Sequence, residues 1–285
     1  KQTIMLGFSD STKDGGYLMA NWSIYKAKIE LTSIARAYDV DLVFFDGRGG
    51  PPARGGGKTQ RFYASMGKEI ENKHIQLTIQ GQTISSQYGS LETAQYNIEK
   101  LLQAGIISEI RQKDSDTLTA KQKDVIDQMA KESHSKFMAL RKHPLFLNYL
   151  ETLSPLKELS EINISSRPVK RNSGKELRLE DLRAISFVTS WSQLKQNIPG
   201  FFGVGTALQW AEDNNLWSYV KQLYESSGMF KTIIDNCAMS MTKSNFDITA
   251  YMKDDPKFGA FWLNLKEEFD RTQSYVLKLS GSSVL

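Results

Sequence analysis

A glycine-rich stretch between two apolar segments constrains the fold of this chain more than any other feature. Residues 47–57 read GRGGPPARGGG, which places six glycines in eleven positions. Because glycine has no side chain and proline lacks a backbone N–H, this stretch is not expected to form a regular element, and its bare backbone can approach a ligand closely. The sequence therefore predicts a loop that either faces a ligand or is mobile without a function.

The segments around this loop alternate between strand and helix patterns. Short apolar runs predict strands at residues 4–8, 40–45 and 75–79, and the first strand is expected to be buried. Residues 9–14 are polar and predict a loop, and an amphipathic helix then extends to about Tyr38. A strand, a helix and a second strand in this order are typical of a βαβ unit with parallel strands.

The helix before the second strand has a face that we expect to pack inward. That face holds Trp22, Tyr25 and Ile29, whereas Lys26, Lys28 and Glu30 are expected to lie off it.

The remainder of the chain is rich in helix patterns. We expect helices at about 91–104, ending at Gly105, and at about 119–142. Residues 182–188 fit either a strand or the start of a helix, and the chain after Gly200 is mostly helical. No repeat and no linker divide the sequence, so we expect a single α/β, helix-rich unit.

Composition excludes several classes of protein. One cysteine, Cys237, permits no internal disulfide and fits a cytoplasmic location, and three histidines leave little material for a zinc site. No apolar run reaches the roughly 18 residues that span a bilayer. A net charge of +4 is too small to indicate nucleic acid binding. Because the chain begins at Lys1 and enters a strand pattern at once, we expect it to be a piece of a longer protein.

Asp10 and Lys13 form the first candidate site. Both follow the first predicted strand, and the carboxyl ends of parallel strands are where α/β barrels carry catalytic groups. The alternative is that residues 9–11 only cap the helix that follows.

Arg48 and Arg54 in the glycine-rich loop form the second candidate site. Glycine backbone offers N–H groups to anions, and arginine adds bidentate donors for phosphate or carboxylate. A phosphate-binding P-loop ending at Gly57 is disfavoured because Pro52 stands where that motif needs glycine. An RNA-binding segment is disfavoured because apolar strands flank the loop.

A basic run at residues 167–171, together with Arg183, forms the third candidate site. Arg183 lies in an apolar context, and a buried arginine needs an anionic partner. The alternative is a solvated basic face. Cys237 and four tryptophans are expected to pack in the core; the tryptophans are Trp191, Trp210, Trp217 and Trp262.

Taken together, these motifs resemble phosphoenolpyruvate carboxylase. The match lies in GFSDSTKD at 7–14, DGRGG at 46–50 with RGG at 54–56, SRPVKR at 166–171, LRAI at 182–185 and GVGTAL at 203–208. The resemblance extends along essentially the whole chain but covers only a C-terminal portion of the family's longer sequence. It therefore implies a fragment that is truncated at both ends.

The resemblance implies a partial (β/α)8 barrel with extensive additional helices. Barrel strands and the glycine-rich loop would occupy about 1–90, and a helical and basic-loop region would occupy about 91–285. The implied activity is a carbon–carbon lyase reaction of anaplerotic carbon dioxide fixation. In it, phosphoenolpyruvate and bicarbonate give oxaloacetate and phosphate with Mg²⁺ or Mn²⁺. The implied full-length protein is a cytoplasmic homotetramer without a nucleic acid or membrane partner.

The resemblance also implies a role for individual residues. Asp10 matches a metal ligand, Lys13 matches a lysine placed for bicarbonate or carboxyphosphate, and Arg167 matches a further catalytic arginine. Arg48 and Arg183 would bind the phosphoryl group, with Gly49 and Gly50 beside Arg48 in the substrate site. Arg54 and Lys243 match positions that hold the allosteric inhibitor, aspartate or malate, in feedback-regulated members.

The sequence departs from the family pattern at several positions. Asp46 stands where the loop usually opens with histidine, and its charge beside Arg48 is expected to weaken substrate affinity or alter the pH profile. Ile79 and Gln82 replace acidic residues, and Gly57 with Lys58 replaces a smaller, less charged pair. Because the family's catalytic histidine and second metal carboxylate lie upstream of Lys1, the fragment alone is expected to be inactive. The alternatives are another phosphoenolpyruvate-utilising barrel enzyme and a nucleotide- or RNA-binding module.

Overall fold

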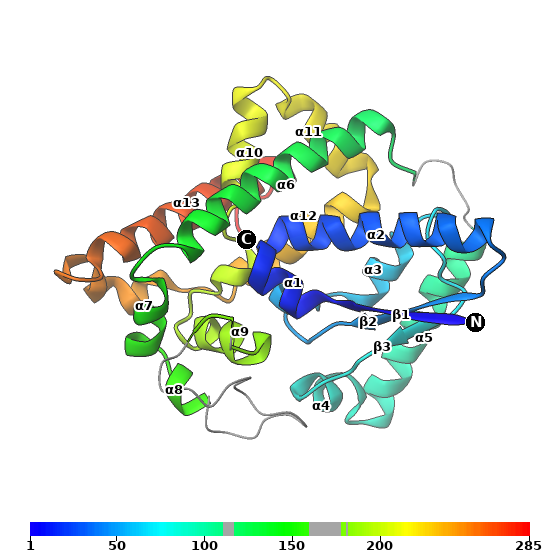
Figure 1. Cartoon of the computed structure of the whole chain (residues 1–285), viewed down its shortest axis with the longest axis horizontal. Coiled ribbons are helices and arrows are strands. Elements are labelled where there is room, and N and C mark those ends of the chain that lie inside the picture. Colours follow the sequence, from blue (N-terminus) through cyan, green and yellow to red (C-terminus); the bar gives the residue numbers. More distant parts are fainter. Residues whose placement is uncertain (111–116, 160–177, 181) are drawn as a thin grey trace.

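Three parallel strands form one sheet in the computed structural model, which describes residues 1–110, 117–159, 178–180 and 182–285. β1 (Gln2–Gly7) pairs with β2 (Leu42–Gly47), and β2 pairs with β3 (Ile75–Leu77). The register sets Leu6 opposite Asp46, and Asp46 opposite Leu77. The carboxyl ends of the strands therefore share one edge, which points toward the middle of the molecule (Figure 1).

Two helices connect β1 to β2. α1 (Phe8–Gly15) follows β1 directly, and α2 (Tyr17–Ala37) leads back to the start of β2. α2 packs on the sheet and on α6 because its apolar residues recur at spacings of three and four, which gives one buried face. The predicted βαβ arrangement and the helix-rich α/β class are confirmed.

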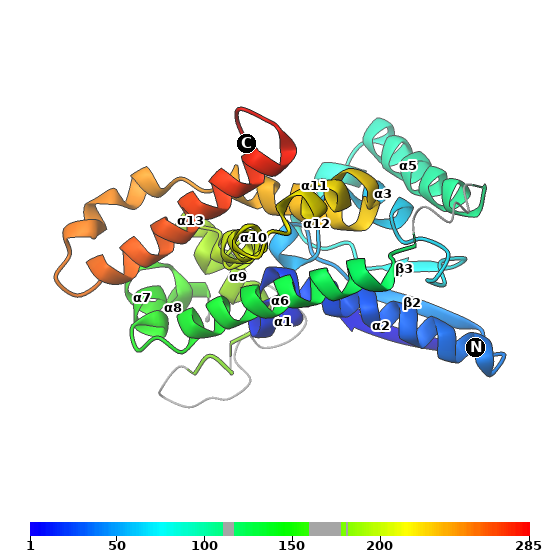
Figure 2. The same ribbon diagram turned by 90° about the horizontal axis from the view of Figure 1, so that it is seen from above.

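The remaining described elements are mostly helices. The α-helices are α3 (Thr59–Ala64), α4 (Gln82–Tyr88), α5 (Leu91–Ile110), α6 (Ala120–Arg141), α7 (Phe146–Leu153), α8 (Leu156–Leu159), α9 (Ala184–Gln193), α10 (Val204–Asp213), α11 (Trp217–Ser226), α12 (Gly228–Met241) and α13 (Gly259–Ser280). Three 3₁₀ segments accompany them, η1 (Pro52–Arg54), η3 (Ile198–Gly200) and η4 (Phe246–Asp254). α10 lies between the long helices α6 and α13 (Figure 2), and the chain beyond Gly200 is helical as predicted.

The core connects the sheet region to this helical region. Cys237 and Trp191 are fully buried in it, Trp262 is buried as well, and the two other expected tryptophans pack against it. The prediction that these residues serve packing is confirmed. Within the described residues no helix combines the length and the apolar character needed to cross a membrane.

Asp127 of α6 joins that helix to α2. Its Oδ1 accepts hydrogen bonds from Trp22 Nε1, at 2.9 Å, and from Lys26 Nζ, and Lys131 pairs with its Oδ2 at 3.1 Å. Because the Trp22 side chain is fully buried, this carboxylate supplies the acceptor that the indole N–H needs.

The expectation of a buried first strand is wrong. β1 forms an edge of the sheet with β2 on one side only, and Met5 is 66% exposed. The described strands form an open sheet of three, whereas a closed barrel pairs every strand on both sides.

Three further predictions about local structure need correction. Residues 9–14 form most of α1 rather than a loop, and Ser11 Oγ donates to the Gly7 carbonyl at 2.6 Å at the start of that helix. α5 continues through Gly105, because one glycine costs a helix only roughly 0.5–1 kcal/mol. The glycine-rich loop contains η1, a single 3₁₀ turn. Of the two interpretations of residues 182–188, the helix is correct from Ala184 onward, in α9.

Candidate active site

The glycine-rich loop, residues 47–57, closes over the carboxyl edge of the sheet. Arg54 Nε donates to Ser9 Oγ at 3.2 Å, in the first turn of α1, and Arg54 Nη2 donates to Gln80 Oε1 at 2.6 Å, beyond β3. Thr78 Oγ1 donates to the Arg48 carbonyl at 3.0 Å. These bonds bring the loop, the start of α1 and the segment after β3 together, as expected for polar groups at the ends of parallel strands.

Arg48 is buried within this loop, with 2% of its surface exposed. Its Nε donates to the Gly55 carbonyl, its Nη2 is 3.5 Å from the Gly56 carbonyl, and its guanidinium carbon lies 3.9 Å from the centre of the Phe62 ring. Its Nη1 is buried and has no hydrogen-bond partner among the described residues. Burial lowers the pKa of Arg48 from its ordinary value, and Tyr63 and Asp46 oppose that shift. An arginine held this way keeps its Nη1 group as a donor for an acceptor that is not part of the described chain.

The loop adopts this closed form because glycine stands where a side chain would not fit. Gly55 has a φ of +78°, and a Cβ there would lie 2.5 Å from the Phe8 side chain. A Cβ on Gly56 would lie 1.9 Å from the Gly50 carbonyl oxygen. The carbonyls that hold Arg48 therefore belong to two positions where the fold requires glycine.

Arg54 is part of the glycine-rich loop and connects it to the sheet edge. It is half-buried, and burial lowers the pKa of its guanidinium while Asp10 opposes that shift. Its backbone carbonyl accepts the Gly49 N–H at 2.7 Å, and its side chain lies directly against Gly49. Arg54, expected to bind an inhibitor, thus lies close to the expected metal ligand Asp10 and holds the loop to the sheet edge.

Lys13 lies on the buried side of α1, with 2% of its surface exposed. Its Nζ donates to the Leu182 carbonyl at 3.0 Å and is 3.7 Å from Asp14 Oδ1. Leu182 precedes Arg183, which is half-buried at the N-cap of α9. The structure therefore brings two expected catalytic residues, Lys13 and Arg183, into adjoining segments.

Other expected site residues are less closely associated. Gly50 lies next to Thr83 at the start of α4 and contacts Gly56 within the loop. Lys243 is exposed just beyond α12, and among the described residues no hydrogen bond or ion pair joins it to Arg54. Arg167 lies outside the described residues.

A buried charged cluster that the sequence motifs did not indicate lies beneath the loop. Lys28 Nζ lies 2.8 Å from Asp46 Oδ2, and the Tyr63 hydroxyl donates to the same oxygen at 2.8 Å. Lys28 and Asp46 are 2% and 1% exposed, so the expectation that Lys28 lies off the packed face of its helix is wrong. Burial lowers the pKa of Lys28, and Asp46 opposes that shift; burial also raises the pKa of Tyr63, and Asp46 raises it further.

A signal for Lys28 was present in the helix spacing. The buried residues Tyr25, Lys28, Thr32 and Ala35 follow one another at intervals of three and four, which is one face of a helix. A lysine on such a face needs an anionic partner, and Asp46 at the end of the next strand supplies it.

Asp10 is the residue expected to bind a metal ion. It is exposed in the first turn of α1, and the described residues contain no group of three or more His, Cys, Asp or Glu side chains that could hold a metal ion. Mg²⁺ is commonly bound by one or two protein carboxylates together with substrate phosphates and water. A single exposed carboxylate at the sheet edge is suited to be one ligand of such a site.

Comparisons with known proteins agree with the motifs at this site. The family model described as phosphoenolpyruvate carboxylase matches residues 1–285. Phosphoenolpyruvate carboxylase of Corynebacterium diphtheriae is 34% identical over 100% of this chain and 32% of its own length. Those of Rhodothermus marinus and of Nostoc are each 33% identical, over 100% and 98% of this chain and 31% and 28% of their own lengths. The chain thus spans about a third of the length of these relatives.

Proposed function

Because the chain belongs to the phosphoenolpyruvate carboxylase family, we propose that it supplies part of the active site of a phosphoenolpyruvate carboxylase. The reaction converts phosphoenolpyruvate and bicarbonate to oxaloacetate and phosphate, a carbon–carbon lyase reaction in reverse. The observation that carries the proposal is Arg48, a buried arginine with an unpartnered Nη1 in a glycine loop at the carboxyl edge of a parallel sheet. Such an arginine is suited to an anionic substrate.

Arg48 would bind the phosphoryl group of phosphoenolpyruvate, with Arg183 as a second donor. Nη1 is available at once, whereas Nε and Nη2 would exchange the Gly55 and Gly56 carbonyls for phosphate oxygens. Gly49 and Gly50 let the phosphate approach the backbone. Fixed guanidinium donors bind more strongly as negative charge grows on the phosphoryl oxygens, so they would favour the transition state over bound substrate.

Lys13 and Arg167 would act on the carboxyl donor. Bicarbonate attacks phosphorus to give carboxyphosphate and the enolate of pyruvate, and CO2 released from carboxyphosphate then carboxylates the enolate. The buried ammonium of Lys13 has donors beyond the one used by the Leu182 carbonyl, and it would hold the bicarbonate oxygens or carboxyphosphate. Asp10 would be this chain's ligand for Mg²⁺ or Mn²⁺, which supplies Lewis-acid stabilisation of phosphate and enolate oxygens when bound.

Three further features belong to the same proposal. The β1–β2–β3 sheet would be part of a (β/α)8 barrel, in a protein that assembles as a homotetramer. Aspartate or malate would bind at Arg54 and Lys243, because an arginine and a lysine suit a dicarboxylate. An inhibitor that takes Arg54 away from Ser9 and Gln80 would release the loop from the sheet edge.

The experiment measures oxaloacetate formation by the complete protein through malate dehydrogenase, with and without bicarbonate. We expect a bicarbonate-dependent signal that Arg48→Ala lowers by roughly 100- to 1,000-fold, the loss typical of one transition-state donor. Arg36→Ala is the matched control. Arg36 is an exposed arginine near the C-terminal end of α2 and pairs with Glu71, so this variant should retain wild-type turnover.

The possible results distinguish the proposed function from the alternative hypotheses. Turnover of phosphoenolpyruvate without bicarbonate would indicate a different enzyme, and wild-type turnover by Arg48→Ala would remove Arg48 from the mechanism. Salt-dependent RNA binding without turnover would favour a binding module. Because the chain spans about a third of its relatives, we expect the 285 residues alone to give no signal; a bicarbonate-dependent signal from them would contradict that expectation.

A further inference from the structure

The carboxylate of Asp46 lies two residues before Arg48, where an unpaired negative charge would interfere with anion binding. Asp46 is close enough to Arg48 to raise the pKa of the guanidinium against the effect of burial. A free carboxylate at this place would attract the guanidinium and repel an incoming phosphate. The structure therefore needs a second cation for Asp46 if Arg48 is to serve a substrate.

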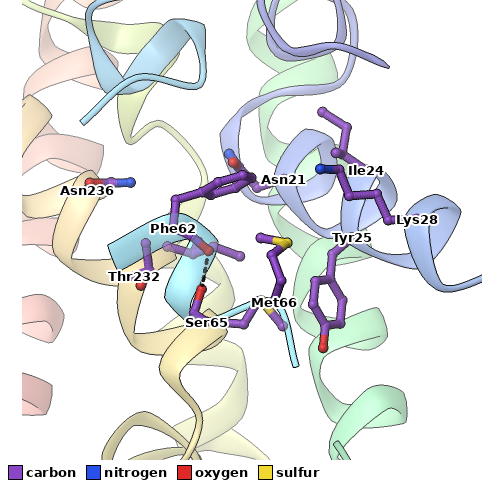
Figure 3. A pocket seen from close by; sticks show the side chains of 11 residues that line it. Asn21, Ile24, Tyr25, Lys28, Phe62, Ser65, Met66, Thr232 and Asn236 are labelled. Carbon is purple, nitrogen blue, oxygen red and sulfur yellow. Dashed lines mark hydrogen bonds between the residues drawn. The ribbon is translucent and has the colours of Figure 1, made fainter. Parts of the chain in front are cut away.

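Lys28 is that second cation. Its side chain projects from α2 into a small pocket that Phe62 and Met66 also line (Figure 3). Only 2% of the Lys28 surface is exposed, so a substrate has no direct access to its ammonium. The Lys28 ammonium lies 2.8 Å from Asp46 Oδ2, which the Tyr63 hydroxyl also contacts. Lys28 thus has a charged partner and no direct route to a ligand.

Lys28 and Arg48 donate hydrogen bonds to different acceptors. Asp46 Oδ2 receives Lys28 and Tyr63 from α2 and α3, whereas the Arg48 guanidinium lies over the Phe62 ring and bonds the carbonyls of its own loop. No hydrogen bond joins the Asp46 carboxylate to the Arg48 guanidinium among the contacts of the described residues. Formal charges of −1 on Asp46, +1 on Lys28 and +1 on Arg48 leave one positive charge, and it resides on Arg48.

We propose that Lys28 is a positioning residue for phosphoenolpyruvate binding, because its pairing with Asp46 keeps that carboxylate off Arg48 and leaves the arginine for the phosphoryl group. The inference rests on the proposed function and extends it to a residue that touches no substrate. It also reverses the expectation that Asp46 weakens the site: with Lys28 in place, the carboxylate is neutralised.

Four forms of the complete protein test the pair: wild type, Lys28→Met, Asp46→Asn and the double variant. Lys28→Met leaves Asp46 with Arg48 as its nearest cation, so the KM for phosphoenolpyruvate should rise by roughly tenfold or more, the effect of one charge at close range. The KM for bicarbonate should stay unchanged. Adding Asp46→Asn removes the carboxylate that competes for Arg48. The KM of the double variant for phosphoenolpyruvate should therefore return to within about threefold of the wild-type value. Lys26→Met is the matched control, because Lys26 is a half-buried lysine two residues earlier on α2 that pairs with Asp127 and not with Asp46; it should leave every kinetic constant unchanged.

A purely structural pair would behave differently. If the pair only stabilised the fold, each single variant would yield less folded enzyme, and the folded fraction would keep the wild-type KM. Unchanged KM in Lys28→Met, or a double variant as impaired as Lys28→Met, overturns the proposal. If Lys28→Met does not fold, Asp46→Asn decides alone: it should keep or lower the KM for phosphoenolpyruvate, and a tenfold increase would refute the inference.

Binding measurements keep this inference separate from the proposed function. If the complete protein shows no carboxylation, the proposed reaction is wrong. Calorimetric titration with phosphoenolpyruvate and with inorganic phosphate still measures the affinity of each of the four forms for these anions. Weaker binding by Lys28→Met and recovery in the double variant would support the role of Lys28 without the reaction. A wild-type protein that binds neither anion would overturn both.

Discussion

Replacing Gly55 with alanine tests whether the closed glycine loop is the form that the chain adopts in solution. Gly55 has a φ of +78°, which costs an alanine roughly 1–2 kcal/mol. A Cβ there would also lie 2.5 Å from the Phe8 side chain, and crowding of this kind typically costs about 1–3 kcal/mol. The closed loop should therefore lose roughly 2–5 kcal/mol relative to open forms.

Hydrogen exchange of the loop amides measures this change. The Gly49 N–H donates to the Arg54 carbonyl at 2.7 Å, and the Gly56 N–H donates to the Pro51 carbonyl at 2.9 Å, so both amides are protected only while the loop is closed. Since about 1.4 kcal/mol is a factor of ten, their exchange in Gly55→Ala should accelerate by roughly 30- to 4,000-fold. Amides of β2, which pair with β1 and β3, should exchange at the wild-type rate.

Gly105→Ala provides the matched control. Gly105 lies inside α5, and a Cβ there would meet no described atom within 4 Å. Alanine should therefore stabilise that helix by roughly 0.5–1 kcal/mol and leave the loop amides unchanged. Wild-type exchange at Gly49 and Gly56 in Gly55→Ala would refute the steric argument for the closed loop.

Three further predictions concern Asp127 and Cys237. Asp127→Ala removes the acceptor of the buried Trp22 N–H, so the free energy of unfolding, measured in urea by tryptophan fluorescence, should fall by roughly 1–3 kcal/mol. Asp127→Asn keeps an acceptor and should lose less. Equal losses in the two variants would contradict the assignment of Asp127 as that acceptor. Hydrogen bonds from Lys26 and then Trp22 lower the pKa of Asp127 below its ordinary 3.8. In the same assay, the extra stability of the wild type over Asp127→Asn should therefore be complete above pH 3.8 and should shrink as the pH falls below it. Burial raises the pKa of the Cys237 thiol, so iodoacetamide should add mass to the chain only after unfolding in urea, and rapid alkylation of the folded chain would show that Cys237 is accessible.

Apolar patterning was sufficient to predict the main elements and much of the core. The strands at 40–45 and 75–79, the long helix between the first two strands and the buried Cys237 were predicted within a few residues, because burial of apolar side chains dominates these segments. The exposure of β1 was not predictable from its own residues. Its apolar pattern does not specify whether a strand has one neighbour or two.

The motifs identified the site residues but not their contacts. Arg48 was identified from its loop, whereas its bonds to the Gly55 and Gly56 carbonyls depend on Phe8 and on close packing within the loop. Lys28 was missed because its residue type was given more weight than its spacing. Its partner Asp46 comes from another element, and a one-dimensional pattern cannot show that the two meet.

The glycine-rich loop packs against α12, a helix that lies much later in the sequence. A Cβ on Gly57 would lie 2.4 Å from Asn236 Oδ1, so α12 lies directly against the loop, although 179 positions separate the two residues. Ribosomes add about 5–20 residues per second, so the loop emerges roughly 9–36 seconds before its support does. During that interval the nascent chain has the glycines and Arg48 without the surface that shapes them. We therefore expect the anion site to form late in biosynthesis, and truncated products of interrupted translation should not sequester substrate.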